Sequence, residues 1–291
     1  MTAAFVLTGG GSLGAVQVGM LTALHESGIE PDLLVGTSVG ALNAAYLAGP
    51  GSSAARVEGL TKLWTRLRRR DVFVPQPQRW VLAALGSVPS LFAAAPLQAL
   101  LERNLGYEAF EDARVPVHVT ATDVVTGHGL LLATGPVVSA VMASASVPGL
   151  LPPVERQGRT LVDGAVGRAD ALTHAAESGV DDIYLLPAGY ACAGPAPSTA
   201  LASALTALSL VLHRQLLDQV AAYRGTARLH VLPPLCPLAV SAADFSHSRS
   251  LVDLSHRSTL RWLDERRGRA DDDPGVLSLH EHRPARQEVR S

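Results

Sequence analysis

The sequence is poor in cysteine, in lysine and in net charge, and each shortage excludes a class of function. Cys192 and Cys236 are the only cysteines among 291 residues and form no C-x-x-C pair. Without a disulfide framework, we expect a reducing compartment, the cytoplasm. Lys62 is the only lysine, so the chain lacks the G-K-[ST] sequence of a nucleotide-binding P-loop. The formal net charge is −2, so we expect no nucleic-acid partner.

Long hydrophobic runs are also scarce. The first residues carry no charged segment ahead of the glycines at 9–11, so we expect no secretory signal peptide. The one uncharged stretch long enough to cross a bilayer spans residues 80–101, and Pro89 and Pro96 interrupt it. We therefore expect a cytoplasmic protein without a clean transmembrane helix, and contact with a membrane surface stays open.

The hydrophobic pattern predicts an α/β fold. Residues 4–8 and 32–36 are short apolar runs typical of buried parallel strands, and each is followed by a helical pattern, at 13–26 and 38–47. This alternation predicts a mostly parallel central sheet with helices on both faces. Further strands are expected at 115–124, 130–134, 160–163, 182–187 and 228–232. Further helices are expected at about 136–145, 168–178, 199–224 and 248–267.

The strand pattern is interrupted by a helical region and ends before a charged tail. Residues 52–107 are helical in pattern but broken by prolines, and strand patterns lie on both sides of them. We therefore predict one α/β domain over residues 1–265 with a helical insertion at about 52–107. Residues 266–291 are rich in charge, contain "DDDPG" and are expected to be disordered.

A pentapeptide at the end of the second predicted strand points to acyl transfer. "GTSVG", residues 36–40, has the G-x-S-x-G pattern and lies directly between a strand and a helix. On such a turn Ser38 is directed outward from the carboxyl edge of the sheet, and Gly36 and Gly40 allow the sharp bend of a nucleophile elbow. A helix beginning at Ser38 would also favour a developing negative charge. Ser38 is therefore the candidate nucleophile, with a simple helix cap as the alternative.

A serine nucleophile needs a base, and the sequence offers an aspartate before a histidine. His174 and His213 lie inside predicted helices, and His280 and His282 lie in the tail, so none has a convincing context. Asp163, in "TLVDGAVG", ends a short predicted strand just before a glycine turn. Active sites of α/β proteins form at this edge of the sheet. Asp-Gly is also a common turn, which is the alternative for Asp163.

The glycine-rich segment "GGGSLG", residues 9–14, follows the first predicted strand and is suited to meet a negative charge. It also matches G-x-G-x-x-G, so a nucleotide-dependent oxidoreductase is one alternative. That function needs an acidic residue near the end of the second strand. Glu30 and Asp32 lie instead at the start of that strand, and its end carries "GTSVG".

Together these motifs resemble the patatin-like phospholipase family. That family combines a glycine-rich oxyanion loop, a G-x-S-x-G serine and a D-G-[GA] aspartate. The chain has "GGGSLG", "GTSVG" and "DGA" (163–165) in that order, with "TATDVVTG" (120–127) and "MASASVPGLLPPV" (142–154) also similar to the family. The resemblance covers about residues 4–190, is weak over the helical insertion and is absent from the tail.

The resemblance implies a patatin-like three-layer sandwich and a carboxylic ester hydrolase of the phospholipase A, lysophospholipase or esterase type. It implies a lipid or small ester as substrate and a catalytic dyad in which Ser38 attacks the ester and Asp163 accepts its proton. No histidine, cofactor or metal is required. The oxyanion hole would be formed by the backbone of the glycine loop, in particular Gly9, Gly10, Gly11, Ser12 and Gly14.

Two features leave room for other functions. Leu13 stands where the family usually has arginine or lysine, which supports an inactive lipid-binding or scaffold protein as a second alternative. The basic segment "KLWTRLRRRD" at 62–71 precedes the apolar residues 80–101. This region is either a peripheral membrane contact or lid within residues 62–101, or a solvated helix end followed by core helices.

Overall fold

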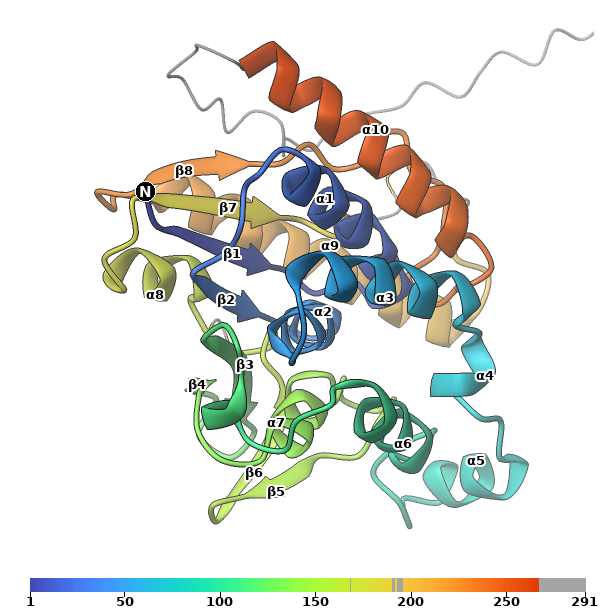
Figure 1. Ribbon diagram of the computed structural model, residues 1–291. Coiled ribbons are helices and arrows are strands. Elements are labelled where there is room, and N and C mark those ends of the chain that lie inside the picture. Colours follow the sequence, from blue (N-terminus) through green and yellow to red (C-terminus); the bar gives the residue numbers. More distant parts are fainter. Residues whose placement is uncertain (168, 190–191, 193–195, 267–291) are drawn as a thin grey trace, which may run out of the picture.

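A computed structural model describes residues 1–167, 169–189, 192 and 196–266. Eight strands form one sheet in the order β5-β6-β3-β2-β1-β7-β8, with β4 also paired to β3 (Figure 1). Strands β3, β2, β1, β7 and β8 are parallel to one another. Strands β4 and β6 each pair with β3 in the antiparallel direction, and β5 pairs with β6 in the antiparallel direction. The strands are β1 Ala3–Leu7, β2 Leu33–Gly36, β3 Val117–Asp123, β4 Gly129–Leu132, β5 Val154–Arg156, β6 Arg159–Asp163, β7 Asp182–Leu186 and β8 Arg228–Val231.

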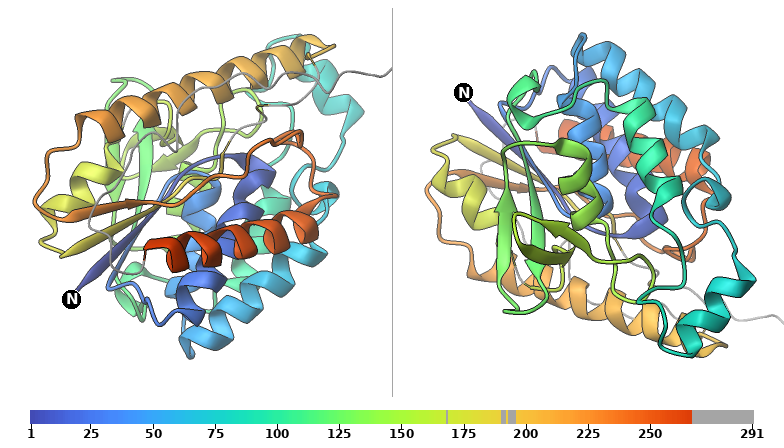
Figure 2. Two further views of the ribbon diagram at one scale, coloured as in Figure 1. Left: turned by 90° about the horizontal axis from the view of Figure 1, so that it is seen from above. Right: turned by 90° about the horizontal axis from the view of Figure 1, so that it is seen from below.

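Helices cover both faces of this sheet, which confirms the predicted α/β class (Figure 2). The alternation of side chains along β1 shows the layers: Phe5 and Leu7 pack into the larger hydrophobic core, and Ala4 and Val6 pack into a second one on the opposite face. The larger core lies under α1 (Gly14–Glu26), α2 (Val39–Ala48), α7 (Val137–Ser144) and α10 (Ser248–Arg266). The second core lies under α8 (Ala171–Glu177) and α9 (Ala200–Ala222).

Four helices and a 3-10 turn connect α2 to β3, where the helical insertion was expected. They are α3 Ser53–Arg66, α4 Arg69–Val72, α5 Pro77–Ala84, α6 Ala95–Asn104 and η2 Phe110–Asp112. Helices α3 and α6 contribute buried residues to the larger core, whereas α5 has none. The uncharged stretch 80–101 is divided between α5, a turn and α6. Among the residues that the structure describes, no helix is both long and apolar enough to cross a bilayer.

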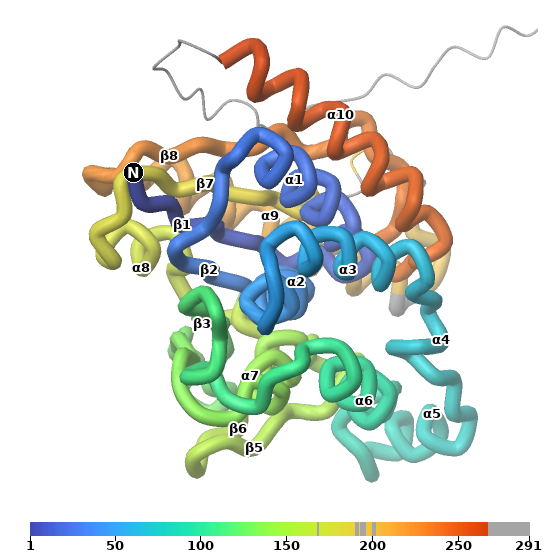
Figure 3. Tube along the Cα trace, viewed as in Figure 1, coloured from blue at the N-terminus to red at the C-terminus, as the bar shows by residue number. Residues whose placement is uncertain are grey.

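The late part of the chain returns to the start of the fold. Helix α10 lies along α1 and places Leu251, Val252 and Trp262 in the larger core (Figure 3). The segment before α10 reaches the glycine-rich loop, because the carbonyl of Ala242 accepts the N–H of Ser12. The tail from 267, for which disorder was predicted, lies outside the described residues.

The edge of β3 brings two strands end to end. Within β3, residues 119–122 pair with β4, residues 117–119 pair with β2 and residues 121–123 pair with β6. The range paired with β4 therefore overlaps the other two. Because β4 occupies one edge of β3 along this overlap, β2 and β6 must share the other edge. They approach from opposite directions, so the end of β6 lies about two residues, roughly 7 Å, beyond the end of β2 along β3.

Candidate active site

Ser38 lies on a strained turn between β2 and α2. Its backbone has φ 56° and ψ −122°, a region that non-glycine residues rarely adopt. The two flanking glycines are required by close backbone contacts: a Cβ on Gly36 would lie 2.5 Å from the Cα of Ala41, and one on Gly40 would press on the carbonyl of Leu7. This is the geometry that the G-x-S-x-G pattern predicts for a nucleophile elbow.

Asp163 reaches Ser38 from the opposite direction. It is the last residue of β6 and pairs with Ala121, while Gly36 at the end of β2 pairs with Val119 on the same edge of β3. The sequence led us to expect Asp163 at the end of a short strand, at the carboxyl edge of the sheet. In the structure β6 is antiparallel to β3 and runs towards the end of β2, so Asp163 faces the end of that parallel strand.

The structure brings the two side chains into contact. The Ser38 hydroxyl lies within reach of the Asp163 carboxylate and favours its ionised form, and the backbone N–H of Ala165 donates a hydrogen bond to Oδ1 of Asp163 at 2.9 Å. Asp163 is only 3% exposed and Ser38 only 8%. Burial raises the pKa of Asp163 to about 6, although both contacts favour its ionised form. The carboxyl group is therefore a stronger base than an ordinary aspartate and still largely ionised at neutral pH.

The glycine-rich loop lies directly beside Ser38. It connects β1 to a 3-10 turn, η1 (Gly11–Leu13), and then to α1. A Cβ on Gly9 would lie 3.1 Å from the Cβ of Ser38, so the loop and the serine are in close contact. Within the described part of the chain, the N–H groups of Gly9, Gly10 and Gly11 donate no hydrogen bond. Unused backbone donors beside a serine hydroxyl are what an oxyanion hole requires.

Two other expected members of the loop are already occupied. The N–H of Ser12 donates to the carbonyl of Ala242 at 2.8 Å, and its hydroxyl donates to the carbonyl of Ser241 at 3.0 Å. The N–H of Gly14 bonds to carbonyls of η1 at the start of α1. Ser12 and Gly14 therefore hold the loop in place, and the unused N–H donors belong to the three preceding glycines.

Leu13, where the family usually has a basic residue, faces inward. It is 1% exposed and belongs to the larger hydrophobic core. Its backbone N–H donates to the carbonyl of Gly10 at 3.1 Å. In this chain the loop is therefore anchored by apolar packing at this position and not by a charged side chain.

A buried polar network supports the loop from below, and the sequence analysis missed it. Gln17 is fully buried and donates through Nε2 to the carbonyls of Thr8 (2.8 Å) and Leu186 (3.0 Å), which lie at the ends of β1 and β7. Asn43 donates to Oε1 of Gln17 at 2.9 Å, and the indole of Trp64 donates to Oδ1 of Asn43 at 2.8 Å. Inside apolar helices these residues carry no sequence motif, so only the tertiary structure reveals their role.

The acidic residues that a dinucleotide site would need lie elsewhere. Asp32 accepts the N–H of Ala3 at 2.7 Å, at the start of β1, whereas the glycine loop follows the end of β1. Glu30 contacts His25 and the hydroxyl of Ser53. Neither carboxylate is at the edge of the sheet where a nucleotide ribose would lie. The geometry therefore gives no support to the oxidoreductase alternative.

Metal-ligating side chains do not converge in the described residues. No group of three or more His, Cys, Asp or Glu in these residues is arranged to hold a metal ion. His118 and His174 form a pair with ring nitrogens 2.7 Å apart, and they connect β3 to α8. His280 and His282, which the sequence places in the tail, lie outside the described residues.

The model of one protein family matches most of the α/β core. Residues 5–176, more than half of the chain, match the family described as patatin-like phospholipase. The chain belongs to the patatin-like phospholipase family. The match contains the glycine loop, Ser38 and Asp163, and so confirms the resemblance seen in the motifs.

Several curated proteins are similar to this family member. "Lysophospholipase nte1" of Aspergillus terreus is 29% identical over 186 residues, 63% of this chain and 12% of that protein. "Uncharacterized NTE family protein Rv1063c" of Mycobacterium tuberculosis is 30% identical over 183 residues, 61% of this chain and 46% of that protein. "Patatin-like phospholipase domain-containing protein 6" of Homo sapiens is 31% identical over 165 residues, 56% of this chain and 12% of that protein. The chain thus matches less than half the length of these relatives.

Among solved structures, the chain is similar to VipD from Legionella pneumophila. The TM-score is 0.44 at 16% identity, and the similarity covers 91% of this chain and 67% of that chain. The type III effector protein ExoU gives a TM-score of 0.41 at 16% identity, over 91% of this chain and 53% of that chain.

Proposed function

We propose that this member of the patatin-like phospholipase family is a lipid acyl hydrolase that cleaves carboxylic esters with Ser38 and Asp163. The observation that carries the proposal is the placement of the Ser38 hydroxyl beside the buried carboxylate of Asp163, at the facing ends of β2 and β6. The Ser38 oxygen attacks the ester carbonyl carbon while Asp163 takes the serine proton. Asp163 then gives this proton to the departing alcohol, which leaves an acyl group on Ser38.

The second half of the reaction reverses these roles. Asp163, ionised again, removes a proton from water, and the resulting hydroxide attacks the acyl carbonyl. The serine oxygen leaves, recovers the proton from Asp163, and the fatty acid is released. A base with a pKa of about 6 suits this exchange, because it is ionised at pH 7 yet close enough to neutrality to return the proton.

Each tetrahedral intermediate places negative charge on the former carbonyl oxygen. We propose that the N–H groups of Gly10 and Gly11 stabilise this oxyanion, with Gly9 providing the close approach to Ser38. The positive end of α1 adds to the stabilisation. One such donor is typically worth about 3–4 kcal/mol in the transition state. Ser12 contributes by holding the loop, since its N–H is bonded to Ala242.

A lipid substrate is supported by the family and by one surface of the molecule. A relative is named a lysophospholipase, and helix α5 exposes apolar side chains that a water-soluble substrate would not need. Trp80, Leu82 and Val81 are 41%, 43% and 59% exposed, and Leu85 at the end of the helix is 73% exposed. We propose that α5, within the region 62–101, contacts the lipid surface from which the substrate is drawn.

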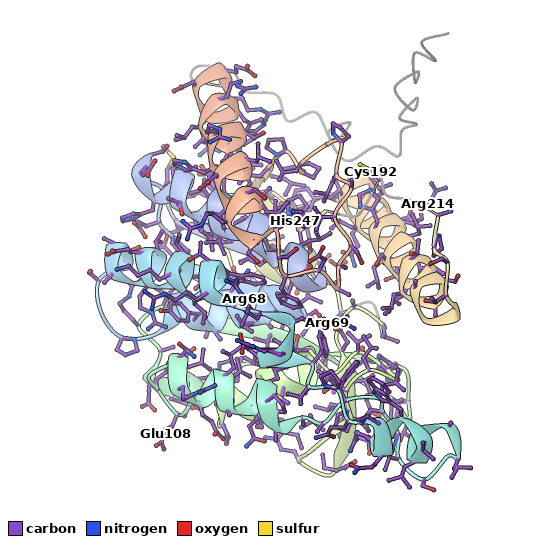
Figure 4. All side chains as sticks on the ribbon, turned by 90° about the vertical axis from the view of Figure 1, so that its right-hand side faces the viewer. Arg68, Arg69, Glu108, Cys192, Arg214 and His247 are labelled. Atoms are coloured by element: carbon purple, nitrogen blue, oxygen red, sulfur yellow. The ribbon has the colours of Figure 1, made fainter. Side chains whose placement is uncertain are left out.

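The charges near α5 fit an anionic surface. Arg68, Arg69 and Arg70 are exposed between α3 and α5. Arg68 and Arg69 are labelled in Figure 4. Helix α5 is also connected to the candidate site. Arg79 donates to the hydroxyl of Ser90 at 2.8 Å, and the strand-like segment at Ser90 pairs with Gly149, three residues after Ser146. A helix with exposed apolar side chains beside arginines is typical of peripheral binding to anionic bilayers.

The dyad is tested with Ser38→Ala and Asp163→Asn. Each variant is expected to abolish p-nitrophenyl-ester and lysophospholipid turnover while circular dichroism stays that of the wild type. Asp182→Asn is the matched control, because Asp182 starts β7 at the opposite end of the sheet. Wild-type turnover by either folded dyad variant would overturn the assignment. No turnover by the wild type, with vesicle binding retained, would favour the inactive lipid-binding alternative.

The membrane contact is tested by flotation with vesicles of phosphatidylcholine and phosphatidylglycerol. Trp80→Ser/Leu85→Ser is expected to reduce flotation severalfold. Leu254→Ser, which removes an apolar side chain that is 48% exposed on α10, controls for general loss of surface hydrophobicity. Equal flotation of both variants and the wild type would refute a role for α5.

A further inference from the structure

The C-terminal end of α7 and the two residues that follow it contact both halves of the candidate site. They lie in "MASASVPG", a segment that resembles the family but to which the proposed mechanism assigns no task. The backbone N–H of Ser38 donates to the hydroxyl of Ser144 at 2.9 Å. Two residues later, the carbonyl of Ser146 accepts the backbone N–H of Asp163 at 3.0 Å. Ser144 and Ser146 are both fully buried.

Ser38 needs such a contact because its backbone is strained. With φ at 56°, its backbone is in a conformation that costs about 1–3 kcal/mol and persists only where surrounding contacts hold it. The Ser144 hydroxyl is the partner of the Ser38 N–H among the described residues. On the opposite side, the Thr120 hydroxyl donates to that of Thr37 at 2.8 Å. The turn is therefore held from the helix by Ser144 and from the sheet by Thr120.

We propose that Ser144 is a positioning residue, which together with the Ser146 carbonyl sets the separation of the Ser38 hydroxyl and the Asp163 carboxylate. The last residue of α7 holds the nucleophile by its side chain, and Ser146, two residues beyond the helix, holds the base by its backbone. A shift of the Ser38 peptide would lengthen the distance over which the proton is transferred. This inference rests on the proposed function for its catalytic consequence, but the contact itself can be tested without turnover.

The test compares Ser144→Thr with Ser144→Val. Threonine and valine have the same shape, so crowding in the buried site affects both equally, and only threonine keeps the hydroxyl. We expect kcat for an ester substrate to be roughly tenfold to a hundredfold lower in the valine variant, with KM unchanged, because binding does not use this bond. Equal kcat values in the two variants would overturn the proposal.

Ser255 supplies the matched control. It is also fully buried, its hydroxyl donates to the carbonyl of Leu251 at 2.8 Å, and it lies on α10, away from Ser38 and Asp163. The same threonine and valine substitutions at Ser255 are therefore expected to give equal kcat values. A loss at Ser255→Val as large as that at Ser144→Val would show a general effect of removing a buried hydroxyl and would overturn the specific role of Ser144.

Hydrogen exchange separates this inference from the proposed function. The Ser38 amide is expected to exchange faster in Ser144→Val than in Ser144→Thr, as measured by mass spectrometry on peptides that cover residues 33–42. This difference does not depend on any turnover. If Ser38→Ala keeps wild-type activity while the exchange difference is present, the proposed function fails and the contact stands. If exchange is the same in both variants, the positioning role fails.

Discussion

Replacing Asp163 with asparagine is expected to stabilise the fold while it abolishes turnover. Burial raises the pKa of this carboxyl group from its usual 3.8 to about 6. At 1.36 kcal/mol per pKa unit, the ionised group costs the folded chain about 3 kcal/mol at pH 8. Asparagine has nearly the same shape, keeps an oxygen that can accept the hydrogen bond from the N–H of Ala165, and carries no charge to bury.

The pH dependence of this effect has a defined sign. Because the folded-state pKa is above the unfolded-state value, the folded chain keeps a proton between about pH 4 and pH 6 that the unfolded chain has released. The free energy of unfolding of the wild type therefore falls as pH rises through this window. On going from pH 8 to pH 5, protonation of Asp163 raises the free energy of unfolding of the wild type by about 1.4 kcal/mol. The difference in free energy of unfolding between Asp163→Asn and the wild type shrinks by the same amount.

Urea unfolding at pH 8 and pH 5 measures both quantities, and comparison of variant with wild type cancels other titrating groups. Asp182→Asn is a control of opposite sign. Burial opposes ionisation of Asp182, but hydrogen bonds from Arg228 and His230 outweigh it and keep its pKa below the usual range. That variant should be destabilised at pH 8. The reasoning is refuted if Asp163→Asn is no more stable than the wild type at pH 8. It is also refuted if the gain in free energy of unfolding over the wild type is as large at pH 5 as at pH 8.

Three further predictions follow from single contacts. The value of kcat/KM should fall below about pH 6 as Asp163 becomes protonated, and a profile flat to pH 5 would contradict its role as base. Gly10→Ala should lower kcat, because the new Cβ would lie 2.5 Å from the Cβ of Ala188. Adding Ala188→Gly should restore part of the lost kcat, and no recovery would refute the clash with Ala188 as the cause. The sulfurs of Cys192 and Cys236 are 3.9 Å apart, so the thiol oxidant diamide should join them in a disulfide; peptide mapping that finds both still alkylated by iodoacetamide would contradict this.

The sequence was informative about the fold where burial is periodic and local. The strand at 4–8 and the helix at 13–26 agree with β1 and α1 to within a residue or so. Strand β5 was missed, because it has three residues and includes Glu155, which is exposed, and Arg156. The antiparallel direction of β6 was missed too, since direction depends on pairing with β3 and leaves no trace in its own five residues.

The candidate site was predicted only where a motif fixes the local backbone. Ser38 and Asp163 lie in short patterns whose geometry follows from neighbouring glycines, and the structure brings them together. Ser144 and Gln17 act through contacts with residues far away in the chain; the segment around Ser144 resembles the family but indicates no role for this residue, and the neighbours of Gln17 give no signal. Likewise, the N–H of Ser12 is occupied by Ala242, a residue that the sequence places 230 positions later.

Labelling with a fluorophosphonate probe, followed by mass spectrometry to locate the adduct, tests the central claim most directly. The account predicts one adduct, on Ser38, which Ser38→Ala abolishes and Asp163→Asn slows strongly, while both variants remain folded. An adduct on another residue, or none on a folded wild type that hydrolyses esters, would contradict the assignment of Ser38 as the nucleophile.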